Sequence, residues 1–352
     1  STLFPYTTLF RSKGWFEKYN KSIKGLKNKD TEGGFMRRKS ITDEQKQEYR
    51  RVAYYYYKEG LTQEEIAKRM QMSRQRVNRI ISSCIELGIV TINIEGLDNS
   101  NLELETKLEQ KYGLKEVRVI DEAAEEMKIQ ELGIEGGKYL RSILKKDDII
   151  GFSRGRNTSA LVEYLPEADE YPENITVTQL MGGSIETEGN VPVDETVYRL
   201  ATKMQAKAVK LYAPIILGSE KLRESFTQEP YFQKSYEIIK KCNIAVVGIG
   251  TASSQWRHMI SLYDIKDKTQ TEWAKDVVGE VCTHFYDCNG TAVEPPFRDR
   301  IISVMLDDYM KIPVRIGIAG GKEKTEAISA AVKGGYINVL ITDLQTAKEL
   351  LA

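Results

Sequence analysis

The stretch DDIIGFSRGRNTSALVEYL, from Asp147 to Leu165, decides how the larger part of this chain folds. It begins with a short apolar run, Ile149 and Ile150, which enters a glycine-punctuated turn. Small polar side chains follow the turn and precede an apolar stripe, which predicts the start of a helix. A strand, a turn of small residues and a helix N-terminus together offer backbone N–H groups and a positive dipole end to an anion.

Strand-like and helix-like segments alternate along the rest of the body, which predicts an α/β domain with a doubly wound parallel sheet. The β-rich runs are EVRVI, DDIIGF, ITVTQLMGG, AVVGIGTA, VRIGIAGG and NVLITD, most of which end in glycine or aspartate. Helical patterns cover residues 123–146, 193–208, 230–241, 323–333 and 343–351. Ligands of such sheets bind outside the carboxyl ends of the strands, and the glycine-rich stretches follow those ends.

The segment before the body predicts a helix-turn-helix. A helical pattern runs from Thr42 to a stop at Gly60, and LTQEEIAKRM follows, in which Thr62 and Glu65 have capping-box spacing. Ser73 then caps a third helix, SRQRVNRIISSCIELG. Its apolar residues repeat at three- and four-residue spacing and predict a buried stripe of Val77, Ile80, Ile81, Cys84 and Ile85. After Gly88, the alternation in IVTINIEG predicts a half-buried wing strand.

Polar side chains crowd into the first two turns of the third helix, which a helix-turn-helix presents to the DNA major groove. Arginine pairs bidentately with guanine, glutamine or asparagine with adenine, and further arginines with phosphate. The alternative is an ordinary amphipathic helix with a solvated basic face, but the capped two-helix spacing favours DNA binding. The expected DNA contacts are Thr62, Gln63, Ser73, Arg74, Gln75, Arg76, Asn78 and Arg79.

The charge distribution agrees with a polyanion-binding head on an acidic body. Residues 36–95 carry 12 Lys and Arg against 8 Asp and Glu, a net +4, and residues 1–35 add another +4 (7 against 3). The whole chain has zero net charge, so the remainder carries −8. The four cysteines are scattered and no secretory signal is evident, which predicts reduced thiols in a cytoplasm. No apolar run approaches the roughly 18–20 residues of a membrane helix.

The first 35 residues are expected to be a non-native or disordered leader. STLFPYTTLFRS corresponds to a translated sequencing adapter, and EGGFM can be encoded as a ribosome-binding site followed by a start codon. We therefore expect the native chain to begin at Met36. The predicted domains are a helix-turn-helix DNA-binding domain over 36–98, a linker helix over 99–113, and an α/β domain over 114–352.

The segment GLTQEEIAKRMQMSRQRVNRII…LGIVTINI resembles the DNA-binding head of the SorC/DeoR-type sugar-responsive transcriptional regulators. The resemblance covers nearly all of the chain after Met36, because GFSRGRNTSAL, QLMGG, VVGIGTA, VVGEVCTHFYDCNG and IGIAGGKEKTEAI…INVLITD occur in the family's order. It implies a winged or sigma-like helix-turn-helix and a sugar-phosphate-binding domain akin to ribose-phosphate isomerases and glucosamine-phosphate deaminases. It also implies that residues 114–352 are the effector-binding domain and that the protein is a homo-oligomer, a dimer or homotetramer, acting on operator repeats. In this family the segment that corresponds to residues 99–113 is a linker and oligomerisation helix, and a plain connector is the alternative.

Effector contacts are expected mainly in the loop from Ser153 to Thr158, which is called the opening loop below. Its small residues and fixed charge suit a phosphate monoester. In the resembling family a lysine reaches the effector phosphate, which corresponds here to Lys324, with Lys322 a weaker choice. An acidic residue faces the sugar hydroxyls and corresponds to Glu280. The full expected set is Ser153, Gly155, Arg156, Asn157, Thr158, Gly182, Gly183, Glu280 and Lys324. The chain departs from many relatives at Arg154, where they have an aromatic residue, and at Asn157, where they have threonine.

The function expected from these patterns is a cytoplasmic, DNA-binding transcriptional regulator, a repressor, controlled by a phosphorylated sugar and without a cofactor. The alternative is a sugar-phosphate isomerase or deaminase with Glu280 or Asp276 as the base. Lysine Schiff-base chemistry through Lys138, Lys145 or Lys146 is a third possibility. VVGIGTASS lacks the third glycine of a dinucleotide-binding motif, and CTHFYDC has no second ligand pair for zinc.

Overall fold

The computed structural model describes residues 42–92, 101–165, 171–183, 192–251 and 268–352. The predicted leader and the first two residues of the predicted linker helix, 99 and 100, lie outside the described residues. The chain divides into two compact units, a head that ends at Ile94 and a body that begins at Glu95. In the part of the chain that is described, no helix is long and apolar enough to cross a membrane.

The head is a three-helix unit built from α2 (Asp43–Tyr57), α3 (Gln63–Arg69) and α4 (Arg74–Glu86). Thr62 and Glu65 form the predicted capping box at the start of α3, and the hydroxyl of Ser73 accepts the amide of Arg76 at the start of α4. The helices bury one apolar cluster, which contains Val52, Ala53, Ile66, Ala67, Val77, Ile80, Ile81 and Cys84. The predicted helix-turn-helix is thereby confirmed. No strand forms over residues 89–92, and the rest of the predicted wing strand lies outside the described residues.

The body contains a seven-stranded, fully parallel sheet in the order β1-β11-β10-β5-β2-β3-β4. Its strands are β1 (Glu116–Ile120), β2 (Ile149–Phe152), β3 (Thr176–Gln179), β4 (Lys207–Val209), β5 (Ile244–Gly248), β10 (Val314–Ile318) and β11 (Val339–Asp343). From β2 the chain winds outward through β3 to β4, and from β5 it winds through β10 to β11 in the opposite direction. The boundary between β2 and β5 is therefore the topological switch point of the sheet.

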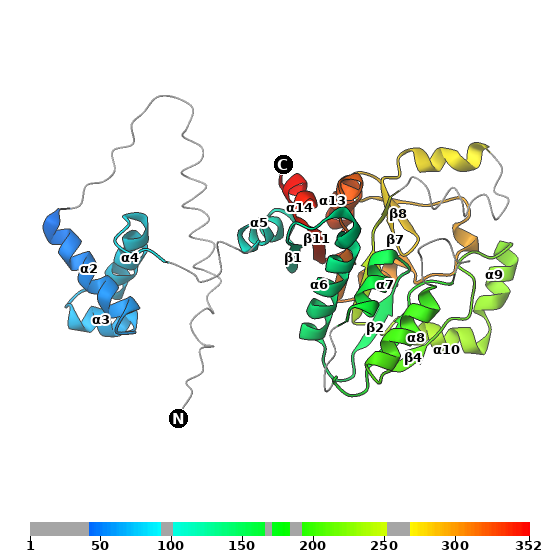
Figure 1. The fold of residues 1–352 in the computed structure, drawn as a ribbon, viewed down its shortest axis with the longest axis horizontal. Helices are drawn as coiled ribbons and strands as arrows, with labels where there is room; N and C mark the ends of the chain where they lie inside the picture. The colour runs from blue at the N-terminus through cyan, green and yellow to red at the C-terminus, as the bar shows by residue number, and fades with distance from the viewer. Residues whose placement is uncertain (1–41, 93–100, 166–170, 184–191, 252–267) are drawn as a thin grey trace. The chain divides into compact units, whose positions relative to one another are not determined.

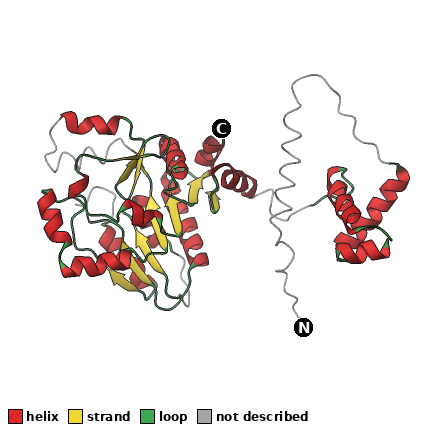
Figure 2. Ribbon diagram, turned by 180° about the vertical axis from the view of Figure 1, so that it is seen from behind, coloured by secondary structure: helices red, strands yellow, loops and turns green. Residues whose placement is uncertain are grey.

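Helices cover both faces of the sheet, as Figure 2 shows. One face packs against α6 (Lys128–Ile143), α7 (Arg156–Glu163) and α8 (Val193–Lys203). The other face packs against α5 (Leu102–Tyr112), α10 (Pro230–Ile239), α12 (Leu306–Met310), α13 (Thr325–Lys333) and α14 (Leu344–Leu351). In β5, Ile244 and Val246 enter the first layer while Ala245 and Val247 enter the second, because successive side chains of a strand point to opposite faces. The predicted doubly wound α/β architecture is confirmed.

Helix α5 packs on the body and closes the free edge of the sheet at β1. Leu108 is fully buried in the core, and Figures 1 and 2 show α5 beside β1 and α14. The carboxylates of Glu105 and Glu109 accept the amides of Val119 (2.8 Å) and Val117 (2.9 Å). One helical turn rises about 5.4 Å and two strand residues span about 6.6 Å, so side chains at i and i+4 match alternate amides of a strand. The two glutamates stand where a further strand would bind.

We expect Glu105→Ala combined with Glu109→Ala to destabilise the body. Each substitution leaves a half-buried backbone N–H without its acceptor, at a cost of about 1–3 kcal/mol per group. Hydrogen exchange of the Val117 and Val119 amides measures the loss directly. The matched control is Glu103→Ala, because Glu103 is on the same helix but pairs with Lys107 at the surface. Protection that is equal in the double variant and in the control would contradict the assigned role of the two carboxylates.

The structure differs from the predictions in two places. Helix α8 ends at Lys203 rather than at residue 208, and the chain continues into β4, whose three residues are too few to show a strand pattern. A separate antiparallel sheet contains β6 (Gly250–Thr251), β7 (Gly279–Val281), β8 (His284–Tyr286) and β9 (Ala292–Val293). Strands β7 and β8 form a hairpin, because Cys282 and Thr283 adopt positive φ values of 50° and 70° and reverse the chain.

Candidate functional site

A cavity of about 690 Å³ opens at the carboxyl ends of β2, β5 and β10, beside the switch point of the sheet. The opening loop supplies one wall, the β6–β7 region a second, the loop after β10 a third, and the start of α6 a fourth. The polar lining residues are Glu125, Glu126, Lys128, Ser153, Arg154, Arg156, Asn157, Thr251, Glu280, Glu323 and Lys324. Of the expected effector contacts, the structure brings six to this cavity: Ser153, Gly155, Arg156, Asn157, Glu280 and Lys324.

Two cations and a helix N-terminus meet in the cavity wall. Arg156 is the first residue of α7, and no side chain caps the amides at this end of the helix. Lys324 ends the short η5 segment (Lys322–Lys324) that leads into α13. Within the described part of the chain, neither cation has an ion-pair or hydrogen-bond partner for its side chain. Unpaired cations beside uncapped helix amides form a suitable site for an oxyanion.

The electrostatics of Lys324 favour an anionic ligand. Burial lowers the pKa of this ammonium group, and the positive charge of Arg156 lowers it further, while Glu323 and Glu280 oppose the shift. Like charges held together in a partly buried place repel each other, and a bound phosphate would relieve the repulsion. Binding of an anion would therefore raise the pKa of Lys324 again.

Asp343, at the end of β11, fixes the glycine loop that leads to Lys324. Its carboxylate accepts the amide of Gly321 (2.7 Å), the hydroxyl of Thr346 (2.7 Å) and the amide of Thr346 (3.0 Å). A Cβ at position 320 would lie 2.2 Å from this carboxylate, and Gly321 has φ of 104°, so both positions require glycine. Although burial opposes it, the hydrogen bonds from Thr346 and Gly321 lower the pKa of Asp343 and keep it ionised. The loop is thus held in one conformation before any ligand binds.

Glu280, on β7, brings a negatively charged group to the cavity lining. Its Oε2 accepts the amide of Thr283 (3.0 Å), and it packs directly on Gly250, where a Cβ would lie 2.6 Å from Oε1. Burial raises the pKa of Glu280, whereas the Thr283 amide and the charges of Arg154 and Lys324 oppose the rise. A half-buried carboxylate of this kind is suited to accept hydrogen bonds from sugar hydroxyls.

Three expected contacts do not line the cavity. The Thr158 hydroxyl is fully buried and donates to the carbonyls of Gly155 (2.8 Å) and Ser153 (3.1 Å), which stabilises the loop from behind. Gly182 packs against Pro214, whose carbonyl oxygen would lie 2.5 Å from an added Cβ, and the Gly183 amide donates to the Ala213 carbonyl. These three residues therefore support the fold around the site, and we remove them from the proposed contacts.

Other candidates lie away from the cavity as well. Lys322 and Asp276 do not line it, and the lysines considered for a Schiff base are exposed to solvent. Lys145 and Lys146 precede β2, at the amino end of the sheet, while the cavity is at the carboxyl end. Asn157 does line it, but its side-chain amide donates to the carbonyl of Ile318 (2.9 Å) and ties the opening loop to β10. We therefore assign Asn157 to positioning the loop.

Sequence reasoning missed the contribution of α6, and it did not place Arg154 among the expected contacts. Lys128 lines the cavity and pairs with Glu125 (2.6 Å), and Arg154 faces Glu280 closely enough to affect its pKa. The ionisable residues of the lining are four cations and four carboxylates, so the cavity as a whole is not positively charged. The anion preference is local to Arg156 and Lys324, where no carboxylate pairs with either cation in the described part of the chain.

The CTHFYDC stretch does not form a metal site among the described residues, where no group of three or more potential ligands gathers. His284 is buried, and its Nε2 lies 3.0 Å from the carbonyl oxygen of Val304. Burial lowers the pKa of His284 to about 3, and the nearby charge of Arg298 adds to the effect, while the Val304 carbonyl opposes it. The imidazole is therefore neutral at neutral pH and acts as a core residue.

Acidification is expected to destabilise the body through His284. In the unfolded chain this imidazole binds a proton below about pH 6.5, whereas the folded chain resists protonation until about pH 3. Unfolding then takes up a proton, so the free energy of unfolding falls by about 1.4 kcal/mol per pH unit below pH 6.5. Urea unfolding of the unaltered chain and of His284→Gln between pH 4 and 8 isolates this contribution. A difference between the two chains that does not change with pH would exclude it.

On the head, the expected DNA-contacting side chains are on the outer side of α3 and α4. Arg74, Gln75, Arg76, Asn78 and Arg79 are all exposed, opposite or beside the buried stripe of α4. Arg76 pairs with Glu48 of α2 (3.0 Å), and the Gln63 amide donates to Asn78 (3.4 Å). Thr62 and Ser73 act as helix caps. Arg74, Gln75 and Arg79 have no side-chain partner within the described residues, which leaves them available to a base edge or a phosphate.

Comparison with known families matches both units of the chain. Residues 99–352 match a family described as "Putative sugar-binding domain", and residues 46–86 match "Sigma-70, region 4". The sorbitol operon regulator of Klebsiella pneumoniae is 32% identical over 307 residues, which cover 86% of this chain and 96% of that protein. The transcriptional regulator LsrR of Escherichia coli is 30% identical over 305 residues, which cover 86% of this chain and 93% of LsrR.

Solved structures of regulators also resemble this chain. The full-length sorbitol operon regulator SorC from Klebsiella pneumoniae superimposes with a TM-score of 0.68 at 31% identity, over 88% of this chain and all of that one. A transcriptional regulator from Streptococcus pneumoniae superimposes with a TM-score of 0.65 at 26% identity, over 72% of this chain and 97% of that chain. These relatives are named as regulators of transcription or of an operon, so the isomerase or deaminase alternative receives no support.

Proposed function

This chain belongs to the SorC family of sugar-binding transcriptional regulators, and on that premise we propose that a phosphorylated sugar controls its binding to operator DNA. The observation that carries the proposal is the pair Arg156 and Lys324, two cations without an ion-pair partner among the described residues, beside the uncapped start of α7. A phosphate monoester supplies the double negative charge and the acceptor oxygens that this arrangement lacks.

The sugar would extend from the phosphate toward Glu280. Its hydroxyl groups would donate to the Glu280 carboxylate, and the apolar side chains of Met181, Ile215 and Ile249 would contact its carbon skeleton. A volume of about 690 Å³ is sufficient for a sugar monophosphate. Ser153, Gly155 and Asn157 would hold the loop around the phosphate, and Arg154 would face the sugar beside Glu280.

Regulation requires that the effector favour one arrangement of subunits over another. We propose that the protein is a cytoplasmic homo-oligomer, in which effector binding changes how two heads match two operator half-sites. A coupling free energy of about 1–3 kcal/mol is enough to change DNA affinity roughly 5- to 150-fold. We propose that the DNA-bound protein represses transcription.

Fluorescence anisotropy of residues 36–352 on labelled DNA from upstream of the gene tests this function at a fixed salt concentration, because phosphate contacts make DNA affinity depend strongly on salt. One member of a panel of sugar phosphates should shift the specific affinity, and the corresponding free sugar should not. Specific DNA binding that no sugar phosphate changes would refute effector control. Turnover of a sugar phosphate by a chain that does not bind DNA would refute the whole proposal.

A further inference from the structure

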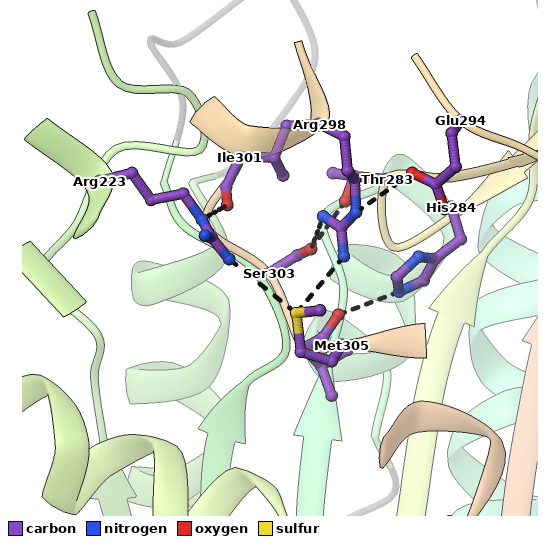
Figure 3. Close-up of polar contacts among 9 residues, drawn as sticks. Arg223, Thr283, His284, Glu294, Arg298, Ile301, Ser303 and Met305 are labelled. Carbon is purple, nitrogen blue, oxygen red and sulfur yellow. Dashed lines mark hydrogen bonds and ion pairs between the residues drawn. The ribbon is translucent and has the colours of Figure 1, made fainter. Parts of the chain in front are cut away.

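A second pair of cations occurs in the body, away from the lining of the effector cavity. Arg223 comes from α9 (Glu220–Thr227) and Arg298 from the short η4 segment (Arg298–Arg300). Figure 3 shows both guanidinium groups converging on the side chain of Met305. A terminal nitrogen of Arg223 lies 3.9 Å from the Met305 sulfur, and a terminal nitrogen of Arg298 lies 3.6 Å from the same atom.

The two arginines contact one carboxylate between them among the described residues, and their other partners here are neutral. The Nε of Arg298 faces the Glu294 carboxylate at 3.5 Å, and the Nε of Arg223 donates to the carbonyl of Ile301 at 2.8 Å. Within the described residues, Glu294 is the one carboxylate in ion-pair range of either arginine. The terminal nitrogens therefore converge on a thioether, which is a weak hydrogen-bond acceptor and carries no charge. A guanidinium group binds an oxyanion far more strongly.

Burial makes this arrangement costly without a ligand. Arg298 exposes 16% of its side chain, and its pKa is lowered by burial and by the charge of Arg223, although Glu294 opposes the shift. Met305 is 43% exposed, so its side chain has room to move aside into solvent. An anion could therefore reach the terminal nitrogens from solvent.

The Ser303 hydroxyl completes the geometry. Its oxygen accepts hydrogen bonds from a terminal nitrogen of Arg298 (3.4 Å) and from the Thr283 hydroxyl (2.9 Å). The hydrogen of the Ser303 hydroxyl is therefore available to donate to a ligand. We propose that Arg223, Arg298 and Ser303 form a second binding site, which takes the phosphate or carboxylate group of a small metabolite in place of the contact with Met305. This site goes beyond the proposed function, which needs only the effector cavity.

Thr283 connects the second site to the effector cavity. Its hydroxyl donates to Ser303, and its amide donates to the Glu280 carboxylate in the cavity wall. Thr283 has a positive φ of 70°, a conformation that is rare for a β-branched residue, so its position depends on these contacts. A ligand at the second site would therefore act on the residue that positions Glu280.

Thermal unfolding of the full chain with inorganic phosphate or succinate as the probe tests the site, with Lys324→Ala as the background that weakens the effector cavity. A ligand that binds the folded state raises the melting temperature, by about 2–4 °C for each 1 kcal/mol of binding in a body of this size. We expect the probe to raise the melting temperature of Lys324→Ala, and Arg298→Gln in that background to remove the rise. A comparison of the shifts with phosphate and with succinate shows whether the site prefers a phosphate or a carboxylate group. Arg300→Gln is the matched control, because Arg300 is on the same segment and its Nε donates to the Leu217 carbonyl.

The outcomes separate this site from the proposed function. If both probes stabilise Lys324→Ala no more than the doubly substituted chain, the second site does not exist. If Lys324→Ala responds like the unaltered chain while Arg298→Gln alone lowers the response, the second site stands and the role of Lys324 is wrong. Arg223→Gln is the second variant, to be used if Arg298→Gln does not fold, and it should remove the same response. An equal loss in Arg300→Gln would overturn the inference.

Discussion

A Lys324→Ala chain will bind its operator as tightly as the unaltered chain and will no longer respond to the sugar phosphate at concentrations that saturate the unaltered protein. The ammonium group lines the effector cavity beside Arg156, and the phosphate would be its anionic partner. Loss of one charge-assisted hydrogen bond costs about 1.5–3 kcal/mol, so affinity for the effector should fall roughly 10- to 150-fold. Anisotropy on operator DNA measures both properties in one titration.

Lys322→Ala is the matched control for this result. Lys322 lies two residues earlier in the same short segment and is exposed, but it does not line the cavity. Both substitutions remove one positive charge from the same region, so a general electrostatic effect would appear in both chains. An unchanged response in Lys324→Ala, or an equal loss in Lys322→Ala, would exclude Lys324 as the phosphate contact.

The second large effect is expected on DNA, where Arg79→Ala should abolish specific binding. Arg79 is exposed near the middle of α4, on the side away from the buried stripe, and its guanidinium group has no partner among the described residues. A bidentate pair with guanine is worth about 1–3 kcal/mol. Two heads on two half-sites would double that loss, which corresponds to a decrease in affinity of about 30-fold to more than 10,000-fold.

Two further substitutions show whether Arg79 reads bases or only contacts phosphate. Arg79→Lys keeps the charge without the planar fork, so it should lose specificity and retain nonspecific affinity. Arg69→Ala removes one charge from α3, where Arg69 pairs with Glu59 (2.8 Å) and lies over the Tyr55 ring (4.2 Å). Comparable operator affinities for Arg69→Ala and Arg79→Ala would mean that Arg79 contributes only charge. Competition with unrelated DNA in the same anisotropy assay provides the comparison.

The elements that were predicted from sequence are those whose signal is local. The stripe from Val77 to Cys84 and the capping box at Thr62 depend on spacing within one helix, and the structure reproduces both. The opening loop was also found from its own residues, because a strand that ends in a small-residue turn before a helix is recognisable without its neighbours. The strand β4 and the hairpin turn at Cys282 were missed, since three residues and an unusual backbone conformation leave no periodic pattern.

The rest of the candidate site depends on which segments the sheet brings together, and sequence spacing does not contain that information. Lys128 reaches the cavity because the parallel order of the strands places the start of α6 at the same end as the opening loop. Glycine was the least reliable signal. Pro214 leaves no room for a side chain at position 182, and Glu280 leaves none at position 250. Packing therefore explains both glycines, and neither one indicates a phosphate site.

The helix that covers β1 limits how copies of this protein can associate. The carboxylates of Glu105 and Glu109 occupy one border of the sheet, and the other border, β4, is only three residues long and exposes Lys207. Neither border offers the long row of free backbone groups that a strand from another molecule needs. We therefore expect oligomers to form through side-chain surfaces, without a continuous intermolecular sheet. Concentrated solutions should for the same reason resist conversion into cross-β fibrils.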